Sequence, residues 1–321
     1  MTKMNAAVVT SFAEPPHYLP FPVPAPSGDQ VLADVLAVGL HPRVRSGASG
    51  SHYTSSGTLP MIPGVDGVGR LPGGKVVYFA ADDDGPGPMA DQTLIDPRRS
   101  VELPAGVDVA KVAAAMNPAM SSWVALRRRV PLQPGQGVLV LGATGNAGAM
   151  AVQVARRLGA GRVTGAGRDL GRLQALIAAG ADDVVQLTDD ADATAAALAA
   201  AAAETDIVID YLWGKPSQQA ITALLTARSD QSRQLDWIQI GSVAGPTIEL
   251  PSVALRSANF RLQGSGQGSV SPRGYIAELP ALIEEINAGT IAVQARPVPL
   301  ADVEQAWTAK EAPGERIVLV P

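Results

Sequence analysis

The pattern of apolar and polar residues divides the chain into two parts of different texture. In the first part, short apolar runs with strand character, at 5–12 and 29–39, alternate with segments rich in Pro and Gly. The proline-rich segment 16–28 between these runs predicts a loop. Further short runs within 64–81 and 89–97 predict strands joined by tight turns. We therefore expect a small, irregular β-rich domain rather than repeated β-α units.

From residue 107 onward the pattern favours helices, and then strands that alternate with helices. Residues 107–130 are mostly helix-forming, with Pro118 predicted to break the helix. After residue 137, apolar runs alternate with segments of helical periodicity, which predicts right-handed crossovers and a parallel sheet. The predicted strands are residues 137–143, 162–167, 183–187, 205–212, 234–242 and 259–266, and the predicted helices are residues 146–160, 170–181 and the alanine-rich segment 191–203.

The last apolar run, residues 314–321, predicts a strand that returns to the first domain. The chain therefore predicts an α/β protein of two domains. Residues 1–120 and 290–321 form the β-rich domain, and residues 121–289 form a doubly wound parallel-sheet domain. A length of 321 residues is typical of two domains, and a hydrophobic fraction of 46% suffices for a sizeable core.

Charge and composition exclude several classes of partner. The formal net charge of −5 predicts no nucleic-acid partner and no anionic membrane partner, because both require a basic surface. The chain has no cysteine, which excludes disulfides, cysteine nucleophiles and cysteine-held zinc. No apolar run reaches the roughly 18 residues of a membrane span, and no secretory signal is visible. A cytoplasmic protein is expected.

The segment VLVLGATGNAGAM at 138–150 carries the candidate chemistry. It places three glycines between a predicted strand and a predicted helix. Glycines in this context allow a tight turn, a close approach to a pyrophosphate and close helix–strand packing, and the helix N-terminus attracts an anion. The segment predicts a dinucleotide site, the alternative being a glycine-rich turn without a ligand. The predicted residues are Gly142, Ala143, Thr144, Gly145, Asn146, Ala147 and Gly148.

The end of the second predicted strand indicates which dinucleotide binds. NAD-binding proteins usually carry Asp or Glu there, bonded to the ribose 2′-hydroxyl. Here the strand ends at Gly167 and Arg168 follows, and a guanidinium suits a 2′-phosphate by bidentate pairing. We therefore predict NADP(H). Asp169 leaves two alternatives open, because it either caps the next helix or takes the ribose role.

Three segments carry a resemblance to a known family: residues 23–42, residues 64–77 with their glycine-rich hairpin, and residues 130–160 with an Ala-x-Gly-x-x-Gly pattern. In this order they resemble the zinc-free quinone oxidoreductase branch of the medium-chain dehydrogenase/reductase superfamily, over essentially the whole chain. The resemblance implies a GroES-like domain followed by a Rossmann domain. The turn also resembles that of atypical short-chain reductases. Those proteins place it on their first strand, and a Tyr-x-x-x-Lys pair is missing here.

The resemblance also bears on metal binding. The zinc-ligand positions of the metal-dependent relatives correspond to His41, Val65 and Asn117. Valine cannot ligate zinc and asparagine is a poor ligand, so no metal site is predicted and a zinc alcohol dehydrogenase is rejected. Without a metal ion, a quinone or a conjugated enone is the expected acceptor, because hydrogen-bond donors near the distant oxygen then suffice.

The candidate catalytic residues follow from the loop 41–53. The resemblance implies that Tyr53 donates a hydrogen bond to the substrate oxygen, with His41 or Asn117 helping. The alternatives are an exposed Tyr53, a His41 that only fixes the loop, and an Asn117 that contacts the nicotinamide or caps a helix. The resemblance also implies cofactor contacts at the strand ends and nearby. They are Ser121, Tyr211, Gly241, Ser242, Gly264, Ser265 and Arg316. For Arg316, the alternative is a plain surface arginine.

The sequence therefore predicts an NADPH-dependent oxidoreductase that transfers hydride to a quinone or an α,β-unsaturated carbonyl compound without a metal ion. A zinc-free alcohol or ketone dehydrogenase is one alternative, and a non-catalytic NADPH-binding protein is another. Residues 248–266 resemble the stretch by which family members pair edge strands across a two-fold axis, so a homodimer is expected.

Overall fold

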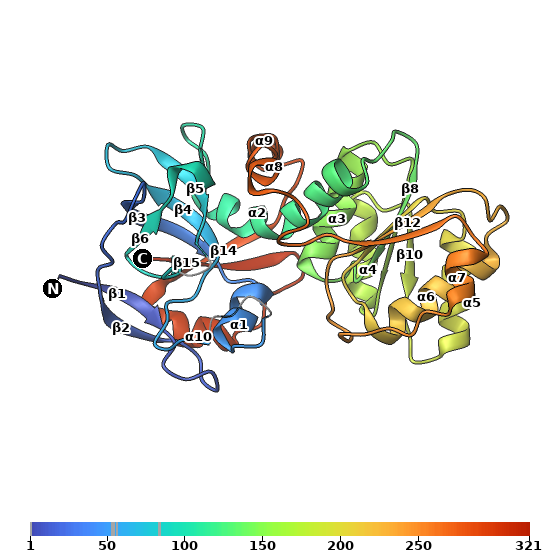
Figure 1. Cartoon of the computed structure of the whole chain (residues 1–321), viewed down its shortest axis with the longest axis horizontal. Coiled ribbons are helices and arrows are strands. Elements are labelled where there is room, and N and C mark those ends of the chain that lie inside the picture. Colours follow the sequence, from blue (N-terminus) through green and yellow to red (C-terminus); the bar gives the residue numbers. More distant parts are fainter. Residues whose placement is uncertain (1, 53–54, 56, 83–84) are drawn as a thin grey trace. The chain divides into compact units, whose positions relative to one another are not determined.

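The computed structural model describes residues 2–52, 55, 57–82 and 85–321, and it divides the chain into two compact units (Figure 1). The first unit, called the β-rich unit, comprises Met1–Pro118 and Ile276–Pro321, and the second, called the parallel-sheet unit, comprises Ala119–Tyr275. The sequence places the return to the first domain at residue 290, whereas in the structure it begins at Ile276.

The β-rich unit contains two antiparallel-rich sheets. Strands β1 and β2 form the smaller one, and the larger one has the order β14-β15-β3-β4-β5-β7, with β6 also paired to β3. The last strand of the chain pairs with β3 through Val318 and Leu319, so it returns to this unit as predicted. The strands are β1 (Lys3–Val8), β2 (His17–Pro22), β3 (Val31–Gly39), β4 (Asp66–Arg70), β5 (Val76–Ala80), β6 (Gln92–Ile95), β7 (Ser100–Glu102), β14 (Gln294–Pro299) and β15 (Glu315–Val320).

Residues 16–28 are not the continuous loop that the prolines predict. His17–Pro22 forms β2 and pairs antiparallel with β1, with Pro20 opposite Asn5 and Pro22 opposite Lys3. Proline is tolerated on an edge strand, where the missing N–H removes no ladder bond. The prediction of a loop is wrong because β2 is an edge strand, with β1 as its one neighbour in the sheet, and an edge strand can contain proline.

The core of the β-rich unit lies where the strands meet short helices. Buried Val8, Val38, Leu40, Ile317 and Leu319 belong to one hydrophobic cluster with residues of the C-terminal helix. The helices of this unit are α1 (Pro42–Ala48), η1 (Pro97–Arg99), α9 (Leu279–Ala288), η3 (Leu300–Asp302) and α10 (Val303–Thr308), and α8 (Pro272–Ile276) ends at the unit boundary.

Helix α2 (Val109–Val124) continues through Pro118, although proline is predicted to break it. Proline removes one helical hydrogen bond and costs roughly 3 kcal/mol in an isolated helix. The residues on both sides, Ala113–Met116 and Ala119, are at most 1% exposed, and this packing holds the helix together. A π-helical turn, η2 (Ala125–Arg129), follows directly.

The parallel-sheet unit has six strands in the order β10-β9-β8-β11-β12-β13, all parallel. This is the 3-2-1-4-5-6 order of the doubly wound dinucleotide fold, which confirms the predicted fold class. The strands are β8 (Gly137–Leu141), β9 (Arg162–Gly167), β10 (Asp183–Gln186), β11 (Ile207–Asp210), β12 (Leu235–Gln239) and β13 (Phe260–Gly264). The helices are α3 (Asn146–Arg157), α4 (Leu170–Ala178), α5 (Ala191–Ala202), α6 (Gly214–Ala227) and α7 (Ser252–Arg256).

The central strands are buried on both faces. Leu139 and Leu141 of β8 and Val208 of β11 are at most 1% exposed, and they share a cluster with Trp237 and Leu224. Continuous apolar strands are typical of a parallel sheet that helices cover on both sides.

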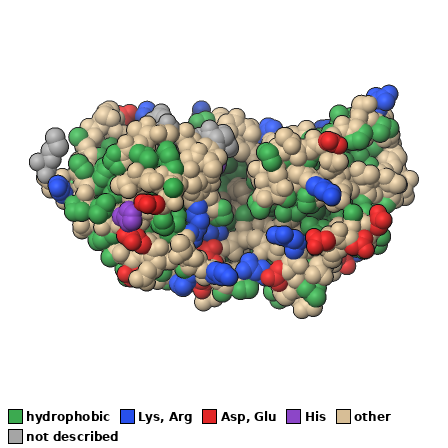
Figure 2. All heavy atoms as spheres, turned by 90° about the horizontal axis from the view of Figure 1, so that it is seen from below, with side chains coloured by type: hydrophobic (Ala, Val, Ile, Leu, Met, Phe, Trp, Pro, Cys, Tyr) green, Lys and Arg blue, Asp and Glu red, His purple; other side chains and the backbone are tan. Residues whose placement is uncertain are grey.

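On the face shown in Figure 2, acidic and basic side chains are mixed with apolar ones. None of the helices in the described part of the chain combines the length and the apolar character that a bilayer crossing requires.

Candidate cofactor and substrate sites

The glycine turn between β8 and α3 depends on the absence of side chains at three positions. Gly142 has φ +83°, which favours glycine. A Cβ atom on Gly148 would lie 2.2 Å from the Gly142 carbonyl oxygen and 2.7 Å from Ala143 Cα. A Cβ atom on Gly167, at the end of β9, would lie 2.5 Å from Thr144 Cγ2. Helix α3 therefore approaches the turn at backbone contact, and the end of β9 lies against the Thr144 side chain.

The first turn of α3 can accept an anion. Gly145 is the residue before the helix and has an extended conformation, and no side chain caps the helix. Backbone N–H groups at a helix N-terminus, together with the helix dipole, favour a bound phosphate. The turn residues Gly142–Gly148 thus fit the pyrophosphate of a dinucleotide, as the spacing predicts.

Asp169 is used as a helix cap in the structure. One of its carboxylate oxygens accepts a hydrogen bond from the Arg172 N–H at 3.0 Å, and Asp169 is the N-cap residue of α4. Arg172 donates from Nη1 to the Thr144 carbonyl oxygen at 3.2 Å, which ties α4 to the glycine turn. Arg168 is exposed, and its guanidinium makes no hydrogen bond or ion pair with any described residue. Of the two roles considered for Asp169, the geometry favours capping.

A buried carboxylate at the end of β11 controls the neighbouring backbone, and sequence reasoning missed it. Asp210 is 0% exposed. It accepts from the N–H groups of Leu212 at 2.8 Å and Trp213 at 3.0 Å, and from Trp237 Nε1 at 3.0 Å. Burial raises the pKa of Asp210, and these hydrogen bonds oppose the rise. The sequence does contain a signal for it, because Asp210 is the one acidic residue at the end of the otherwise apolar strand Ile207–Asp210.

Trp213, whose N–H donates to Asp210, has an unusual backbone conformation. Its φ of 53° and ψ of −165° lie in a region that is essentially restricted to glycine. Within the described residues it is the one non-glycine residue with positive φ. Trp213 follows β11, and β11 pairs with β8, the strand that leads into the glycine turn. The strand order reverses between β8 and β11. In open parallel sheets, ligands bind at such a reversal.

Ser121 and Tyr211, both predicted to contact the cofactor, form a hydrogen bond with each other. Their hydroxyl oxygens are 2.8 Å apart, and Tyr211 is 8% exposed. Burial raises the pKa of Tyr211 to about 12, although the Ser121 hydroxyl opposes the rise. Tyr211 also lies against the next predicted contact, because a Cβ atom on Gly241 would be 2.7 Å from the Tyr211 carbonyl oxygen. Ser242 is exposed.

The loop after β13 is held by an arginine that the sequence did not single out. Arg129, in η2, donates from Nε to the Gly264 carbonyl oxygen at 3.0 Å and from Nη1 to the Ser269 carbonyl oxygen at 3.3 Å. Ser265 is 7% exposed, and its N–H donates to the Gln239 carbonyl oxygen at 2.8 Å. The strand ends predicted to contact the cofactor are therefore fixed from both sides.

In the β-rich unit, His41 is buried. It is 3% exposed, it precedes α1, and its Nε2 lies 3.0 Å from Asp66 Oδ1. Asn117 is half-buried within α2. Tyr53, the predicted hydrogen-bond donor, lies outside the described residues. No group of three or more His, Asp or Glu side chains that could hold a metal ion occurs in the described ranges.

Arg316 is not a surface arginine. It is 4% exposed, and its Nη1 donates to the Leu40 carbonyl oxygen at 2.9 Å and lies 3.2 Å from Glu311 Oε2. Burial lowers the pKa of the Arg316 guanidinium, and the charge of Glu311 opposes this. These partners lie in the β-rich unit, so the side chain fixes the backbone just before His41.

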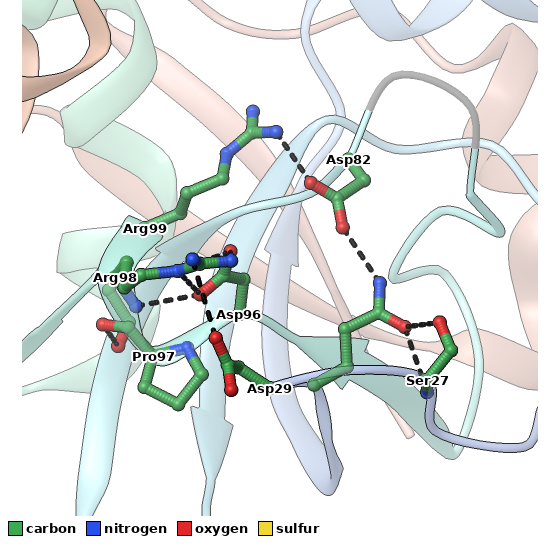
Figure 3. Close-up of polar contacts among 9 residues, drawn as sticks. Ser27, Asp29, Asp82, Asp96, Pro97, Arg98 and Arg99 are labelled. Atoms are coloured by element: carbon green, nitrogen blue, oxygen red, sulfur yellow. Dashed lines mark hydrogen bonds and ion pairs between the residues drawn. The ribbon is translucent and has the colours of Figure 1, made fainter.

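Pro42–Ala48 forms helix α1, so this part of the predicted loop 41–53 is helical. A cavity of about 330 Å³ opens beside α1 within the β-rich unit. Its lining includes Val44 and Ala48 of α1, together with Ile62, Val65 and Asp82. Figure 3 shows how Asp82 is held, and how Arg98 bridges acidic residues nearby. Arg99 Nη1 donates to Asp82 Oδ1 at 2.6 Å, and Gln30 Nε2 donates to Asp82 Oδ2 at 2.9 Å. The acidic part of the wall is thus neutralised, and the rest is mainly apolar.

The strand order, the glycine turn and the open helix start define a dinucleotide-binding protein of the Rossmann type with an added β-rich unit. No family model matches the chain. It is 31% identical, over 99% of its length, to a protein of Emericella nidulans described as "Probable NADPH-dependent quinone reductase tdiC", all of which it covers. The chain belongs to the quinone oxidoreductase branch of the medium-chain dehydrogenase/reductase superfamily, which confirms the resemblance.

A further relative and two solved structures are also similar to the chain. The chain is 33% identical to the quinone oxidoreductase of Lama guanicoe over 42% of this chain and 43% of that protein. Its fold is similar to that of the quinone oxidoreductase of Thermus thermophilus, whose complex with NADPH is also known, with a TM-score of 0.81, 23% identity, and coverage of 99% of this chain and 100% of that one. The quinone oxidoreductase of Pseudomonas syringae gives a TM-score of 0.80 at 20% identity, with both chains covered completely.

Proposed function

We propose that the protein is an NADPH-dependent oxidoreductase that transfers hydride to a quinone or an α,β-unsaturated carbonyl compound without a metal ion. The observation that carries the proposal is the glycine turn, where Gly148 brings α3 into contact with the turn backbone and no side chain caps the helix. The relative that spans the whole chain is described as an NADPH-dependent quinone reductase. A relative from Arabidopsis thaliana, 26% identical over 52% of the chain and 47% of that protein, is described as an NADPH-dependent alkenal/one oxidoreductase.

The preference for NADPH over NADH follows from two neighbouring residues. One oxygen of the Asp169 carboxylate accepts from the N–H of Arg172, so this side chain is held at the start of α4 as a helix cap. The exposed guanidinium of Arg168 stands next to it and fits a 2′-phosphate as a bidentate partner.

The chain's own residues bind and orient the reactants. We propose that the backbone of Gly142–Gly148 holds the pyrophosphate and that Tyr211, Gly241, Ser242, Gly264 and Ser265 border the rest of the cofactor, with Tyr211 fixed by Ser121. When bound, NADPH supplies a hydride from C4 of its nicotinamide. The mainly apolar cavity beside α1 is the expected place for the hydrophobic part of the substrate. The role of Tyr53 as a hydrogen-bond donor stays a prediction.

The test is consumption of NADPH and of NADH against a panel of quinones, enones and simple ketones, with identification of the products. We expect oxidation of NADPH with quinones or enones and little oxidation of NADH. Reduction of NADP⁺ by an alcohol, with no activity on enones, would identify an alcohol dehydrogenase. Tight NADPH binding without turnover on any carbonyl compound would identify a non-catalytic binding protein.

We also propose a homodimer formed along β13. This strand is the last one in its sheet, and Val253 and Leu255 in the preceding helix α7 are 54% and 51% exposed. An unpaired strand edge beside exposed apolar side chains favours self-association. Light scattering on the purified protein tests this, and a monomeric mass at micromolar concentration would contradict it. The cytoplasmic location stays a prediction from the sequence.

A further inference from the structure

The peptide group between Leu212 and Trp213 has a strained orientation and a hydrogen bond on each of its two polar atoms. The Trp213 N–H donates to Asp210 Oδ1 at 3.0 Å, and the Leu212 carbonyl oxygen accepts from the Ala244 N–H at 2.8 Å. The φ of 53° at Trp213 is unfavourable for a residue with a Cβ atom. A residue persists in such a conformation only where the surrounding structure imposes it.

A half-turn of this peptide group would remove the strain. The rotation changes ψ of Leu212 and φ of Trp213 together, and it moves φ of Trp213 into the extended region that every residue adopts. The ψ of −165° at Trp213 is already extended. The same rotation would take the N–H away from Asp210 and the carbonyl oxygen away from Ala244. These two hydrogen bonds therefore oppose the relaxed orientation.

The carboxylate of Asp210 accepts from three donors at once. Oδ1 accepts from the N–H groups of Leu212 and Trp213, at 2.8 and 3.0 Å, and Oδ2 accepts from Trp237 Nε1 at 3.0 Å. Asp210 and Trp237 are both 0% exposed, which excludes surface water as a substitute partner. An ionised carboxylate only accepts, whereas an amide of the same size has one accepting oxygen and one donating nitrogen. The carboxylate is therefore matched to this set of donors.

The strained peptide group lies against the glycine turn that we propose as the pyrophosphate site. A Cβ atom on Gly142 would lie 3.1 Å from Leu212 Cδ2 and 3.2 Å from Tyr211 Cβ, so both side chains pack directly on the turn. The Gly241 N–H donates to the Asp210 carbonyl oxygen at 3.1 Å. Residues 210–213 thus contact both the glycine turn and the loop after β12, and all of these residues belong to the parallel-sheet unit.

We propose that Asp210 is a positioning residue of the cofactor site, which holds the Leu212–Trp213 peptide group in its strained orientation beside the glycine turn. The inference rests on the NADPH binding proposed above. The held orientation is the one that binds the cofactor tightly, because a half-turn releases the Ala244 N–H and displaces the side chains packed on Gly142. Where the flipped form is populated, the apparent Kd rises by the inverse of the fraction that stays held.

The first test observes the held peptide group directly and needs no turnover. The chain has four tryptophans, so labelling with ¹⁵N-tryptophan gives few backbone amide signals, and a Trp213→Phe variant assigns the one that disappears. We expect slow hydrogen exchange at the Trp213 amide in the wild type and faster exchange in Asp210→Asn. The asparagine oxygen cannot serve all three donors, and release of the Trp213 N–H is the loss that also relieves strain. Rapid exchange in the folded wild type, or equal rates in both proteins, would overturn the proposal.

The second test measures the Kd for NADPH by titration. Asp210→Asn should raise it about tenfold, because relief of a positive φ is equivalent to roughly 5- to 150-fold in an equilibrium constant. In quinone or enone reduction at saturating NADPH, kcat should stay within about threefold of the wild type, since the variant weakens binding and leaves the reacting groups unchanged.

A Trp213→Gly background separates positioning from a general loss of stability. Glycine adopts a positive φ without strain, so nothing drives the flip when Asp210 is replaced. In this background, Asp210→Asn should change the Kd for NADPH by no more than about twofold. If Asp210→Asn does not fold alone, the double variant, which is free of the strain, is compared with Trp213→Gly. A tenfold rise that persists in the Trp213→Gly background would contradict the proposal.

The matched control is Asp206→Asn, which lies just before β11 and therefore at the opposite end of that strand. Asp206 is 7% exposed, its Oδ2 accepts from the Gly137 N–H at 2.8 Å, and its Oδ1 accepts from Arg233 Nε at 2.9 Å. We expect the control to lower the melting temperature and to leave the Kd for NADPH near the wild-type value. An equal rise in the control, or an unchanged Kd in Asp210→Asn, would refute the positioning role alone. A wild-type protein that binds no NADPH would overturn the proposed function as well.

Discussion

The substitution Gly148→Ala tests the central claim about the glycine turn. The new Cβ atom would lie 2.2 Å from the Gly142 carbonyl oxygen and 2.7 Å from Ala143 Cα, whereas carbon atoms pack at about 3.5–4.0 Å. Both obstructing atoms are backbone, so no side chain can rotate away. Helix α3 and the turn must therefore separate by roughly 1 Å, which costs about 1–3 kcal/mol as overpacking does elsewhere.

The matched control is Gly171→Ala in α4. There the new Cβ atom would lie 3.5 Å from Asp169 Oδ1, an ordinary contact, and the position is exposed. Alanine in place of an exposed helical glycine stabilises by up to about 1 kcal/mol. Gly148 is also helical, so Gly148→Ala would gain as much if the turn were open. The difference between the two variants thus measures the steric conflict alone.

Two measurements decide the outcome for Gly148→Ala. Its melting temperature should fall by about 4–8 °C for a loss of about 2 kcal/mol in a chain of this size, while that of Gly171→Ala should hold or rise. The Kd for NADPH should rise at least about tenfold, because the displaced N–H groups no longer converge on the pyrophosphate. At an NADPH concentration of about 100 times the wild-type Kd, the ligand stabilises the wild type by about 2.7 kcal/mol and such a variant by about 1.4 kcal/mol. Wild-type values of both quantities would refute the reasoning.

Three further predictions concern the strand ends. Arg168→Ala should raise the KM for NADPH about tenfold or more and leave the KM for NADH unchanged. Asp169→Ala, which removes only a helix cap, should lower the free energy of unfolding by about 1 kcal/mol without changing the preference for NADPH. The opposite pattern would reverse the roles of the two residues. Trp213→Gly should be more stable in urea than Trp213→Ala by about 1 kcal/mol or more, because both lose the indole and only glycine relieves the positive φ; equal stabilities would contradict the strain. The pKa of Tyr211 is raised to about 12 in the folded state, so as the pH rises above about 10 only the unfolded tyrosine ionises and stability falls; Tyr211→Phe should remove about 2–3 kcal/mol of this loss by pH 12, and identical pH profiles would disprove it.

Local spacing predicted the parts of the site that are local in the sequence. The turn from Gly142 to Gly148 lies within one strand–helix junction, so the residues that shape it are close in the chain. The ends of the parallel strands were also predictable, because apolar runs mark the strands and their carboxyl ends share one edge. Pro118 was misread for the opposite reason, since the packing that keeps α2 continuous comes from elsewhere in the fold.

The choice between two roles for Asp169 shows where a sequence stops being informative. An acid just after the second strand fits a ribose contact and a helix cap equally well, because the residue type and the spacing are the same in both cases. The decisive quantity is the direction of one side chain, which points to the Arg172 N–H in the structure. The preference for NADPH agrees with this direction, since the acid caps the helix and the guanidinium of Arg168 beside it has no partner among the described residues.

The contact between His41 and Asp66 presents a harder case, because the two residues are far apart in the chain. His41 and Asp66 are separated by 25 residues, and three different strands bring them together with Tyr78. The sequence identified His41 only through its position in a family whose ligand pattern is broken here, and it gave no reason to connect it with Asp66 or Tyr78. The structure shows that the ring lies 3.0 Å from a buried carboxylate, and no local spacing of residues could have predicted this contact, because it depends on the pairing of strands that are distant in the sequence.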